Sequence, residues 1–281
     1  MPATAALVRF LSSRPMIYDA LYEDPDLASF YDADNEWSAS FDYCLTLAEG
    51  CASVLDLGCG TGVLSAAIAQ AGCGAVWGVD PAVAMLEIAR ARPGGDRVNW
   101  VAADGRNVRV GRRFDLVVMT GHAFQVFLTQ ADRLAVLQTV AAHLAPHGRF
   151  IFDSRNPAVE EWREWVPAES GREVDHPELG PAQAWNDVAR DPETGIVTYE
   201  TCYRVVADGR LLRSSSRIAF PSREEIDELL KLAGLTVDAW LGDWTGGPCN
   251  PDSPEMIPIG RLKAGDGAAE HAGCESGGKQ G

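Results

Sequence analysis

The chain has 281 residues, of which 46% are hydrophobic and 23% charged, the balance of a globular protein that can bury a sizeable core. Its formal net charge is −16, and since proteins that bind phosphate backbones usually carry a basic face, the charge disfavours DNA and RNA as partners. The seven cysteines form no C-x-x-C pair and no zinc-type spacing, which indicates reduced thiols, no metal site and a cytoplasmic location.

The N-terminal segment, residues 1–50, is predicted to form short helices before the first core strand. Its residues 16–47 interleave aromatic and acidic side chains, among them Tyr31 and Trp37. The apolar patch at residues 5–11 is interrupted by an arginine and is too short for a signal peptide or a membrane span. The sequence therefore predicts no membrane partner.

The central motif of the chain covers residues 53–62. An apolar run ends there in three glycines spaced two apart, which is typical of a buried parallel strand entering a tight turn. Residues 63–71 contain neither Gly nor Pro and predict a helix directly after the turn. Glycine allows a ligand to approach the backbone, and the start of a helix offers unpaired N–H groups. The motif therefore predicts a ligand cradle.

The glycine spacing favours one cofactor class. A dinucleotide fingerprint, G-x-G-x-x-G, would place its third glycine at position 63, where the chain has Val63. Residues 56–62 read Asp-Leu-Gly-Cys-Gly-Thr-Gly, which resembles the first motif of class I S-adenosylmethionine-dependent methyltransferases. The resemblance covers roughly residues 54–157, with a weaker match at 222–263. An NAD-dependent oxidoreductase and a non-catalytic cofactor-binding or regulatory protein remain the alternatives.

The resemblance implies roles for this motif and for the N-terminal aromatics. In the family, the glycines lie against the methionine and ribose parts of the cofactor, the preceding acid holds its amino-acid end, and leading aromatics enclose the sulfonium. The matching residues are Asp56, Gly58, Cys59, Gly60, Tyr31 and Trp37. An aromatic face can stabilise a sulfonium cation by about 0.5 to 2 kcal/mol, although the same aromatics could instead anchor the helices to the core.

A second apolar run, residues 75–80, ends at Asp80, and Pro81 fits the first position of the following helix. A carboxylate about 20 residues after the glycine turn can accept hydrogen bonds from a ribose diol, in dinucleotide and adenosylmethionine binders alike. In the resembled family Asp80 is the ribose acid, and Met85 lies near the adenine. Met85 equally fits a core position of the helix.

The third predicted strand, residues 98–102, is followed by Asp104 and Gly105. The resemblance places here an acid that accepts a hydrogen bond from the adenine amino group, and Asp104 matches it. An ordinary Asp-Gly turn is the alternative.

The fourth predicted strand, residues 114–119, leads to Thr120 and His122, where donor and acceptor should meet. The Pro-Pro-aromatic tetrad and the Pro-Cys pair of methyltransferases that act on nucleobases are both missing. Histidine has an ordinary pKa near 6.5 that suits proton removal from a hydroxyl or an amine. His122 is therefore the candidate general base, with a cofactor or acceptor contact and a purely structural histidine as alternatives.

The core continues with a predicted helix at residues 131–145 and a fifth strand at 149–153. Arg155 and Asn156 follow at the same sheet edge, where they either touch the acceptor or form a solvated loop. Residues 158–220 then break the alternation of strands and helices. They contain three strand-like runs, at 182–190, 196–206 and 210–219.

This pattern predicts an antiparallel insertion, which in similar enzymes is a lid over the substrate or a dimerisation surface. A helix over residues 222–232 opens with a capping box, and strands at 235–241 and 255–263 complete the core. Pro258 is uncomfortable in a central strand because it cannot donate to the ladder. The chain from residue 264 is glycine-rich and polar, as in a disordered tail.

The sequence thus predicts an α/β, doubly wound, seven-stranded and mostly parallel Rossmann-like sheet with an antiparallel β insertion after the fifth strand. The predicted function is methyl transfer from S-adenosyl-L-methionine, leaving S-adenosyl-L-homocysteine, to an oxygen or nitrogen of a small-molecule acceptor. The sequence leaves the oligomeric state open, with a homodimer as one alternative. The predicted parts are residues 1–50 over the cofactor, 51–157 with 221–263 as the core, 158–220 as the insertion, and 264–281 as the tail.

Overall fold

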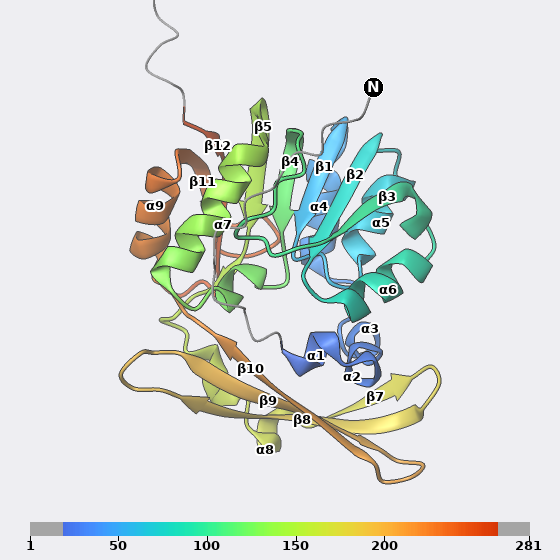
Figure 1. Ribbon diagram of the computed structural model, residues 1–281. Coiled ribbons are helices and arrows are strands. Elements are labelled where there is room, and N and C mark those ends of the chain that lie inside the picture. Colours follow the sequence, from blue (N-terminus) through green and yellow to red (C-terminus); the bar gives the residue numbers. More distant parts are fainter. Residues whose placement is uncertain (1–18, 264–281) are drawn as a thin grey trace, which may run out of the picture.

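The computed structural model describes residues 19–263, which form a mixed sheet covered by helices and a second, antiparallel sheet beside it (Figure 1). The strands of the mixed sheet are β1 (Ser53–Leu57), β2 (Ala75–Asp80), β3 (Val98–Ala102), β4 (Phe114–Met119), β5 (Leu144–Phe152), β6 (Ser154–Arg155), β11 (Leu235–Leu241) and β12 (Glu255–Leu262). They follow the order β11-β12-β5-β4-β1-β2-β3, with β6 paired to β12. This order confirms the predicted doubly wound fold.

The parallel strands bring their carboxyl ends together at one edge of the sheet. β1 pairs in parallel with β2 on one side and with β4 on the other, and β4 pairs in parallel with β5. The chain runs outward from β1 to β3 and then returns to β4, so the strand order reverses between β1 and β4. Open α/β sheets bind ligands beyond the carboxyl ends of the strands at such a reversal. The loops after β1, β2, β4 and β5 are therefore the expected site.

Helices cover both faces of this sheet. They are α4 (Ala39–Leu47), α5 (Val63–Gln70), α6 (Val83–Ala91), α7 (Gln130–His143) and α9 (Arg223–Leu232), with short 3₁₀ turns η1 (Gly95–Arg97) and η2 (Ala123–Val126). Leu137 of α7 and Leu229 of α9 are buried in one cluster with Phe150 of β5. Leu64 and Ile68 of α5 are buried in another cluster, together with α4. The apolar spacing of each helix thus determines the face that it covers.

The second sheet is the predicted antiparallel insertion. Its strands are β7 (Arg172–His176), β8 (Gly180–Arg190), β9 (Val197–Val205) and β10 (Leu211–Ile218), in the order β10-β9-β8-β7, preceded by η3 (Glu161–Glu164) and α8 (Pro167–Ser170). Its strands alternate buried and exposed positions, as in β10, because one face of the sheet packs against the rest of the protein.

The N-terminal helices α1 (Ala20–Glu23), α2 (Pro25–Ala28) and α3 (Tyr31–Asp34) lie between the insertion sheet and the core (Figure 1). Phe30 stacks on Tyr203 of β9, with ring centroids 4.4 Å apart. Asp34 is bound by the guanidinium of Arg172 and accepts a hydrogen bond from the Tyr203 hydroxyl at 2.8 Å. The insertion therefore holds the N-terminal helices in place.

The structure differs from the predicted secondary structure at several points. β5 begins at Leu144 rather than 149, because the chain passes straight from α7 into the strand. β7 was not predicted, since its sequence is short and mostly polar. α6 begins at Val83, so Pro81 precedes the helix instead of opening it. Residues 1–18 and the predicted disordered tail, 264–281, lie outside the described residues.

The predicted difficulty at Pro258 is resolved by a gap in the ladder. β12 is an inner strand between β11 and β5, and Pro258 lies opposite Trp240 of β11. On its other side, pairing with β5 stops at Ile259 and resumes with β6 at Met256. The missing N–H thus falls where the ladder is already interrupted, next to Asp153.

Candidate active site

The glycine turn after β1 has the backbone expected of a ligand cradle. Gly58, Gly60 and Gly62 have φ values of 74°, 52° and 74°, which are unfavourable for other residues. A Cβ atom at Gly62 would lie 2.3 Å from the Trp100 ring, so packing requires glycine there. A Cβ at Gly60 would meet only the ring of Tyr31, at 4.0 Å. Gly60 therefore faces an open side of the turn.

Asp80 lies at the end of β2 and is tied to this turn. One carboxylate oxygen accepts the Gly60 N–H at 2.9 Å, and the other accepts the Ala82 N–H at 2.9 Å. Burial raises the pKa of Asp80, and the two backbone hydrogen bonds oppose this. Because a carboxylate oxygen can accept two hydrogen bonds, each oxygen retains capacity for one hydroxyl.

Asp56 is buried within β1, with 2% of its surface exposed. One oxygen accepts a hydrogen bond from the Ser65 hydroxyl at 2.7 Å, and the other, Oδ1, has no partner among residues 19–263. Burial raises the pKa of Asp56 to about 7, although the Ser65 bond opposes the shift. A buried oxygen without a partner is unusual, and it fits a carboxylate that awaits a donor from a ligand.

Tyr31 of α3 lies across the two loops that follow β1 and β4. Its ring approaches Gly60, and its hydroxyl would lie 3.9 Å from a Cβ at Gly121. Burial raises the pKa of Tyr31, and the neighbouring Tyr199 phenol and Asp80 carboxylate raise it further, so the phenol stays neutral. Tyr199, on the insertion strand β9, was not predicted as a site residue.

Two predicted cofactor residues have other partners in the structure. Both oxygens of Asp104 are bound by the Arg106 guanidinium, which also contacts Asp132. This pairing competes with the adenine contact expected of Asp104. Met85 is fully buried, in a small cluster with Ala28 of α2, as the core alternative proposed.

The remaining predicted cofactor residues differ in their burial and in their contacts. Trp37 is 46% exposed and donates to Asp42 of α4 at 2.8 Å, so the structure gives no support to its predicted role around the sulfonium. Cys59 points back toward β2, where its sulfur would lie 3.0 Å from a Cβ at Gly78. Thr120 is buried at the end of β4, and Pro81 and Gly105 are half-buried in the turns after β2 and β3.

His122 is held by two acidic residues from neighbouring strands. It has a positive φ of 60° directly after Gly121, which turns the chain out of β4. Its backbone N–H donates to Asp153 at 2.9 Å, and its ring Nε2 lies 2.8 Å from Oε1 of Glu255. Burial raises the pKa of Asp153, and the facing His122 partly offsets this. Of these partners, Asp153 was visible as a strand-end acid, whereas Glu255 carried no sequence signal.

Arg155 and Asn156 follow β5 but are occupied by protein partners. The Arg155 guanidinium contacts Gln125 and Glu161 and lies 5.0 Å over the Trp165 ring. The Asn156 amide donates to the carbonyls of Pro251 and Ser253. Both side chains therefore shape the loop after β5, and Asn156 joins it to the loop between β11 and β12.

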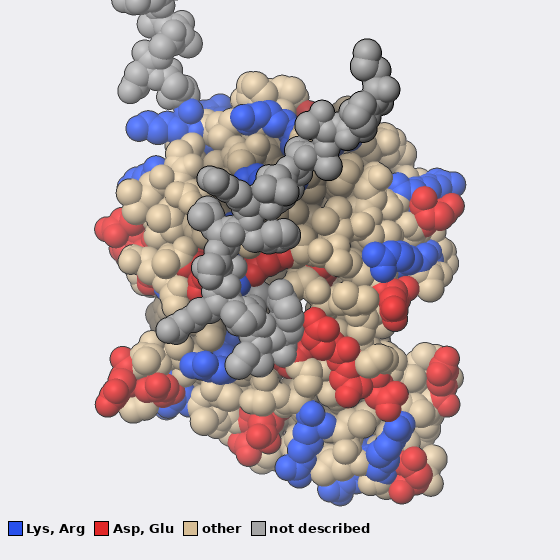
Figure 2. All heavy atoms as spheres, in the orientation of Figure 1, with Lys and Arg blue, Asp and Glu red and all other residues tan. Residues whose placement is uncertain are grey.

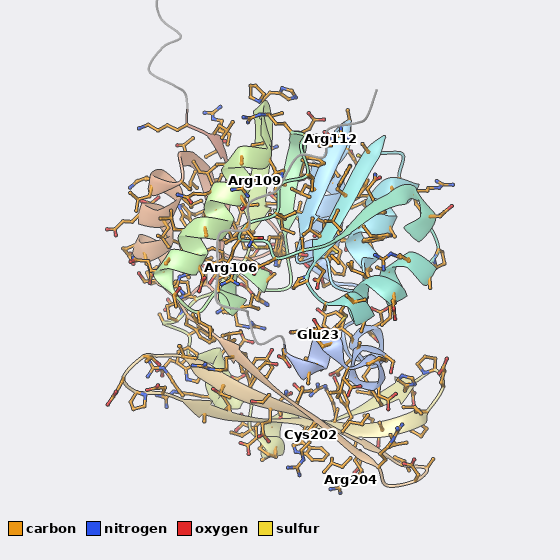
Figure 3. The ribbon with its side chains drawn as sticks, in the orientation of Figure 1. Glu23, Arg106, Arg109, Arg112, Cys202 and Arg204 are labelled. Carbon is orange, nitrogen blue, oxygen red and sulfur yellow. The ribbon has the colours of Figure 1, made fainter. Side chains whose placement is uncertain are left out.

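Charged side chains are unevenly distributed around these loops. Figure 2 shows acidic residues gathered where α1–α3 meet the core, whereas basic residues lie at the opposite end of the core sheet and on the insertion. Arg106, Arg109 and Arg112 lie on the core, far from Arg204 on the insertion (Figure 3). The Arg109 guanidinium donates to the hydroxyl of Thr139 at 2.9 Å. These four arginines therefore do not form one patch.

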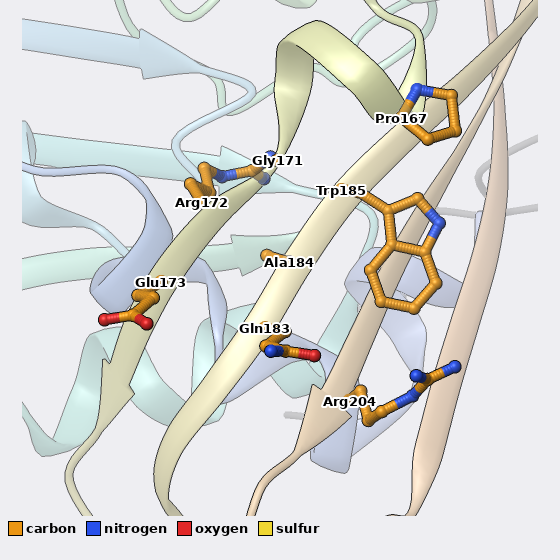
Figure 4. A pocket seen from close by; sticks show the side chains of 8 residues that line it. All are labelled: Pro167, Gly171, Arg172, Glu173, Gln183, Ala184, Trp185 and Arg204. Carbon is orange, nitrogen blue, oxygen red and sulfur yellow. The ribbon is translucent and has the colours of Figure 1, made fainter.

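A hollow of ≈ 640 Å³ lies on the insertion sheet, away from these loops (Figure 4). Trp185 and Arg204 form part of its wall, with the guanidinium 5.3 Å from the ring centroid. None of the predicted site residues lines it. The hollow is therefore separate from the loops after β1, β2 and β4.

These loops fit adenosylmethionine in three respects. The open side of Gly60 leaves room next to Tyr31, Asp80 retains acceptor capacity for ribose hydroxyls, and Asp56 has an unpartnered buried oxygen. Along residues 19–263, no helix has the length and apolar character needed to cross a membrane.

Comparison with known proteins identifies the family. Residues 54–148 match the family model described as a methyltransferase domain. The chain is 31% identical over 211 residues to the cypemycin N-terminal methyltransferase of a Streptomyces species, covering 74% of this chain and 82% of that protein. It is 29% identical over 203 residues to the dTDP-3-amino-3,6-dideoxy-alpha-D-glucopyranose N,N-dimethyltransferase of Streptomyces fradiae, covering 69% and 74%.

Solved structures agree in fold. The CcbJ methyltransferase from Streptomyces caelestis has a TM-score of 0.68 at 21% identity, over 85% of this chain and 96% of that one. CalS10, an amino pentose methyltransferase from Micromonospora echinaspora solved with adenosylmethionine bound, has a TM-score of 0.60 at 24% identity, over 83% and 94%. The protein belongs to the class I S-adenosylmethionine-dependent methyltransferases.

Proposed function

We propose that the protein methylates an amine nitrogen of a small-molecule acceptor. The observation that carries this proposal is the pair of acidic residues, Asp153 and Glu255, that surrounds His122 beyond β4 and β5. Such an environment attracts an ammonium group and repels a carboxylate or phosphate placed next to it, while leaving room for an anionic group elsewhere in the acceptor. By their names, the Streptomyces fradiae relative methylates nitrogen and the cypemycin relative acts at an N-terminus.

In this proposal the cofactor lies along the loops after β1, β2 and β3. Asp80 accepts from the ribose, and the backbone from Gly58 to Gly60 lies against the methionine part. The unpartnered oxygen of Asp56 accepts from its amino group, and Tyr31 covers the sulfonium. Further contacts come from Cys59, Pro81, Asp104, Gly105 and Thr120, whereas the buried Met85 packs in the core.

The residues of the site promote the reaction mainly by positioning the acceptor nitrogen against the methyl group. Bound adenosylmethionine supplies an electrophilic methyl group next to a positive sulfur. The loops hold the acceptor nitrogen within about 3 to 3.5 Å of that carbon, which can account for most of the rate. An amine enters as ammonium at neutral pH, so its nitrogen must first release a proton. His122 receives that proton, and the lone pair left on the nitrogen is then free to attack.

We assign the insertion to acceptor binding, because its inner face holds α1–α3 and places Tyr199 next to Tyr31. We also place the protein in the cytoplasm, in keeping with the six free cysteines between residues 19 and 263. Nucleic acid is an unfavoured acceptor in this proposal, given the charge of −16 and the dispersed arginines.

The test is transfer of tritiated methyl groups from adenosylmethionine to paired acceptors. The probes are dTDP-3-amino-3,6-dideoxyglucose and a short peptide with a free N-terminus, each beside its hydroxy analogue. Label is expected in an amine and in the low-molecular-weight fraction of a cell extract. Label in the hydroxy analogues alone would refute the choice of nitrogen, and label confined to RNA or DNA would refute the small-molecule acceptor.

A further inference from the structure

Glu255, the first residue of β12, contacts the site histidine although 132 residues lie between them in the chain. Its Oε1 lies 2.8 Å from Nε2 of His122, and 15% of its side chain is exposed. The backbone of Glu255 is fixed by pairing with Arg155 of β6 and by a hydrogen bond from its N–H to the Gly242 carbonyl at 3.2 Å. The carboxylate is therefore presented to the histidine by a rigid strand.

This contact determines which ring nitrogen carries the proton. An ionised carboxylate only accepts hydrogen bonds, so Nε2 of a neutral His122 must be the protonated nitrogen. The lone pair is then on Nδ1, for which the structure gives no partner among residues 19–263. The neighbouring backbone N–H is fixed separately by Asp153. The ring thus has one nitrogen engaged and one available.

The other oxygen of Glu255 argues against a merely structural pair. Oε2 is buried and has no hydrogen-bond partner among residues 19–263. A carboxylate that serves only to secure a loop usually has both oxygens satisfied. Asp153 also faces the His122 ring, so Glu255 is one of two carboxylates there. The nearby cation is Arg155, on the adjoining β6.

From this geometry we infer that Glu255 is the positioning residue of the methyl-transfer site, keeping His122 in the Nε2–H tautomer so that Nδ1 takes the proton of the acceptor. This inference rests on the proposed role of His122. An N–H bond of the acceptor ammonium breaks, the Nδ1–H bond forms, and the electron pair stays on the acceptor nitrogen. Glu255 then stabilises the resulting imidazolium, as the buried carboxylate does in a Ser-His-Asp triad.

The tautomer of His122 can be measured without an acceptor, by NMR of the ring ¹⁵N signals of the full chain. The measurement is made at about pH 8.5, where an ordinary histidine is neutral. Loss of the signals in His122→Asn assigns them. We expect the Nε2–H form in the wild type and in Glu255→Gln, whose amide oxygen still accepts, and a mixture of tautomers in Glu255→Met. Asp115→Asn is the matched control, because Asp115 contacts His147 at 2.8 Å away from the site.

Turnover provides the second measurement, with whichever amine probe accepts label. Glu255→Met should lower kcat at least tenfold, Glu255→Gln should fall between it and the wild type, and the affinity for S-adenosylhomocysteine should change less than twofold. An Nδ1–H tautomer in the wild type would overturn the inference, as would a Glu255→Met variant that keeps both tautomer and kcat. If neither amine accepts label, the proposed acceptor fails and the tautomer alone decides the role of Glu255.

Discussion

Replacing Asp80 by Asn should weaken cofactor binding by one to two orders of magnitude. Each Asp80 oxygen accepts one backbone N–H, from Gly60 or Ala82, and has capacity for one ribose hydroxyl. Hydrogen bonds to a charged acceptor contribute about 1.5 to 3 kcal/mol, which corresponds to roughly a 10- to 150-fold change in Kd. The Asn amide also places its NH₂ group against one of the two backbone donors.

The assay is calorimetric titration with S-adenosylhomocysteine. Asp115→Asn is a close control, because Asp115 likewise accepts two backbone N–H groups, from Ala52 and Ser53, at the other end of the sheet. Thermal unfolding of both variants shows whether the turn after β1 is intact. An Asp80→Asn protein that is folded and binds within twofold of the wild type would refute the assignment of the ribose to Asp80.

Three further predictions concern stability. S-adenosylhomocysteine at about 100 times its Kd should stabilise the protein by about 2.7 kcal/mol in thermal unfolding, whereas NAD should have no effect. Burial raises the pKa of Asp56 to about 7, above an unfolded value near 3.9, so its stabilising contribution is present below about pH 4 and is lost as the pH rises to about 7. Asp56→Asn should remove this pH dependence in urea unfolding of the cofactor-free protein. Asp34→Asn should cost roughly 2 to 4 kcal/mol of unfolding free energy, because Arg172 and Tyr203 lose a shared partner with only 7% of its side chain exposed. Asp26→Asn, at an exposed pair with Arg210, should cost less than about 1 kcal/mol.

The strands of the core were largely predictable. β2, β3 and β4 match the sequence prediction because each is an apolar run with a clear end at an acid, a glycine or a turn. β5 was predicted too short, since Pro146, His147 and Gly148 look like a helix stop, yet they lie within an extended chain. β7 was not predicted, because only Val174 and His176 are buried in it, too few to show an alternation of apolar and polar residues in the sequence.

The site was predictable where its residues adjoin a motif and not elsewhere. Asp56, Asp80 and His122 lie in the last residues of recognisable strands or just beyond them, so the sequence locates them. The partners that fix their surroundings come from distant segments: Glu255 from β12 and Tyr199 from the insertion. Trp37 illustrates the converse, because this aromatic of the predicted segment donates a hydrogen bond to Asp42 of α4, the helix that follows it. Such choices depend on tertiary packing that local patterns do not encode.

The position of α1–α3 between the core and the insertion sheet has a consequence for synthesis on the ribosome. Each of these helices has four residues, far below the length at which an isolated helix persists in water. Their packing partners include Arg172 and Tyr203, which emerge well over a hundred residues later. These helices can contact α6 once it is made, as Ala28 does in its cluster with Met85, but while β1 to β5 are made they lack their partners on the insertion. The packing of α1–α3 is complete only when β7 and β9 have left the exit tunnel, so the final ordering of these helices should be a late step of folding.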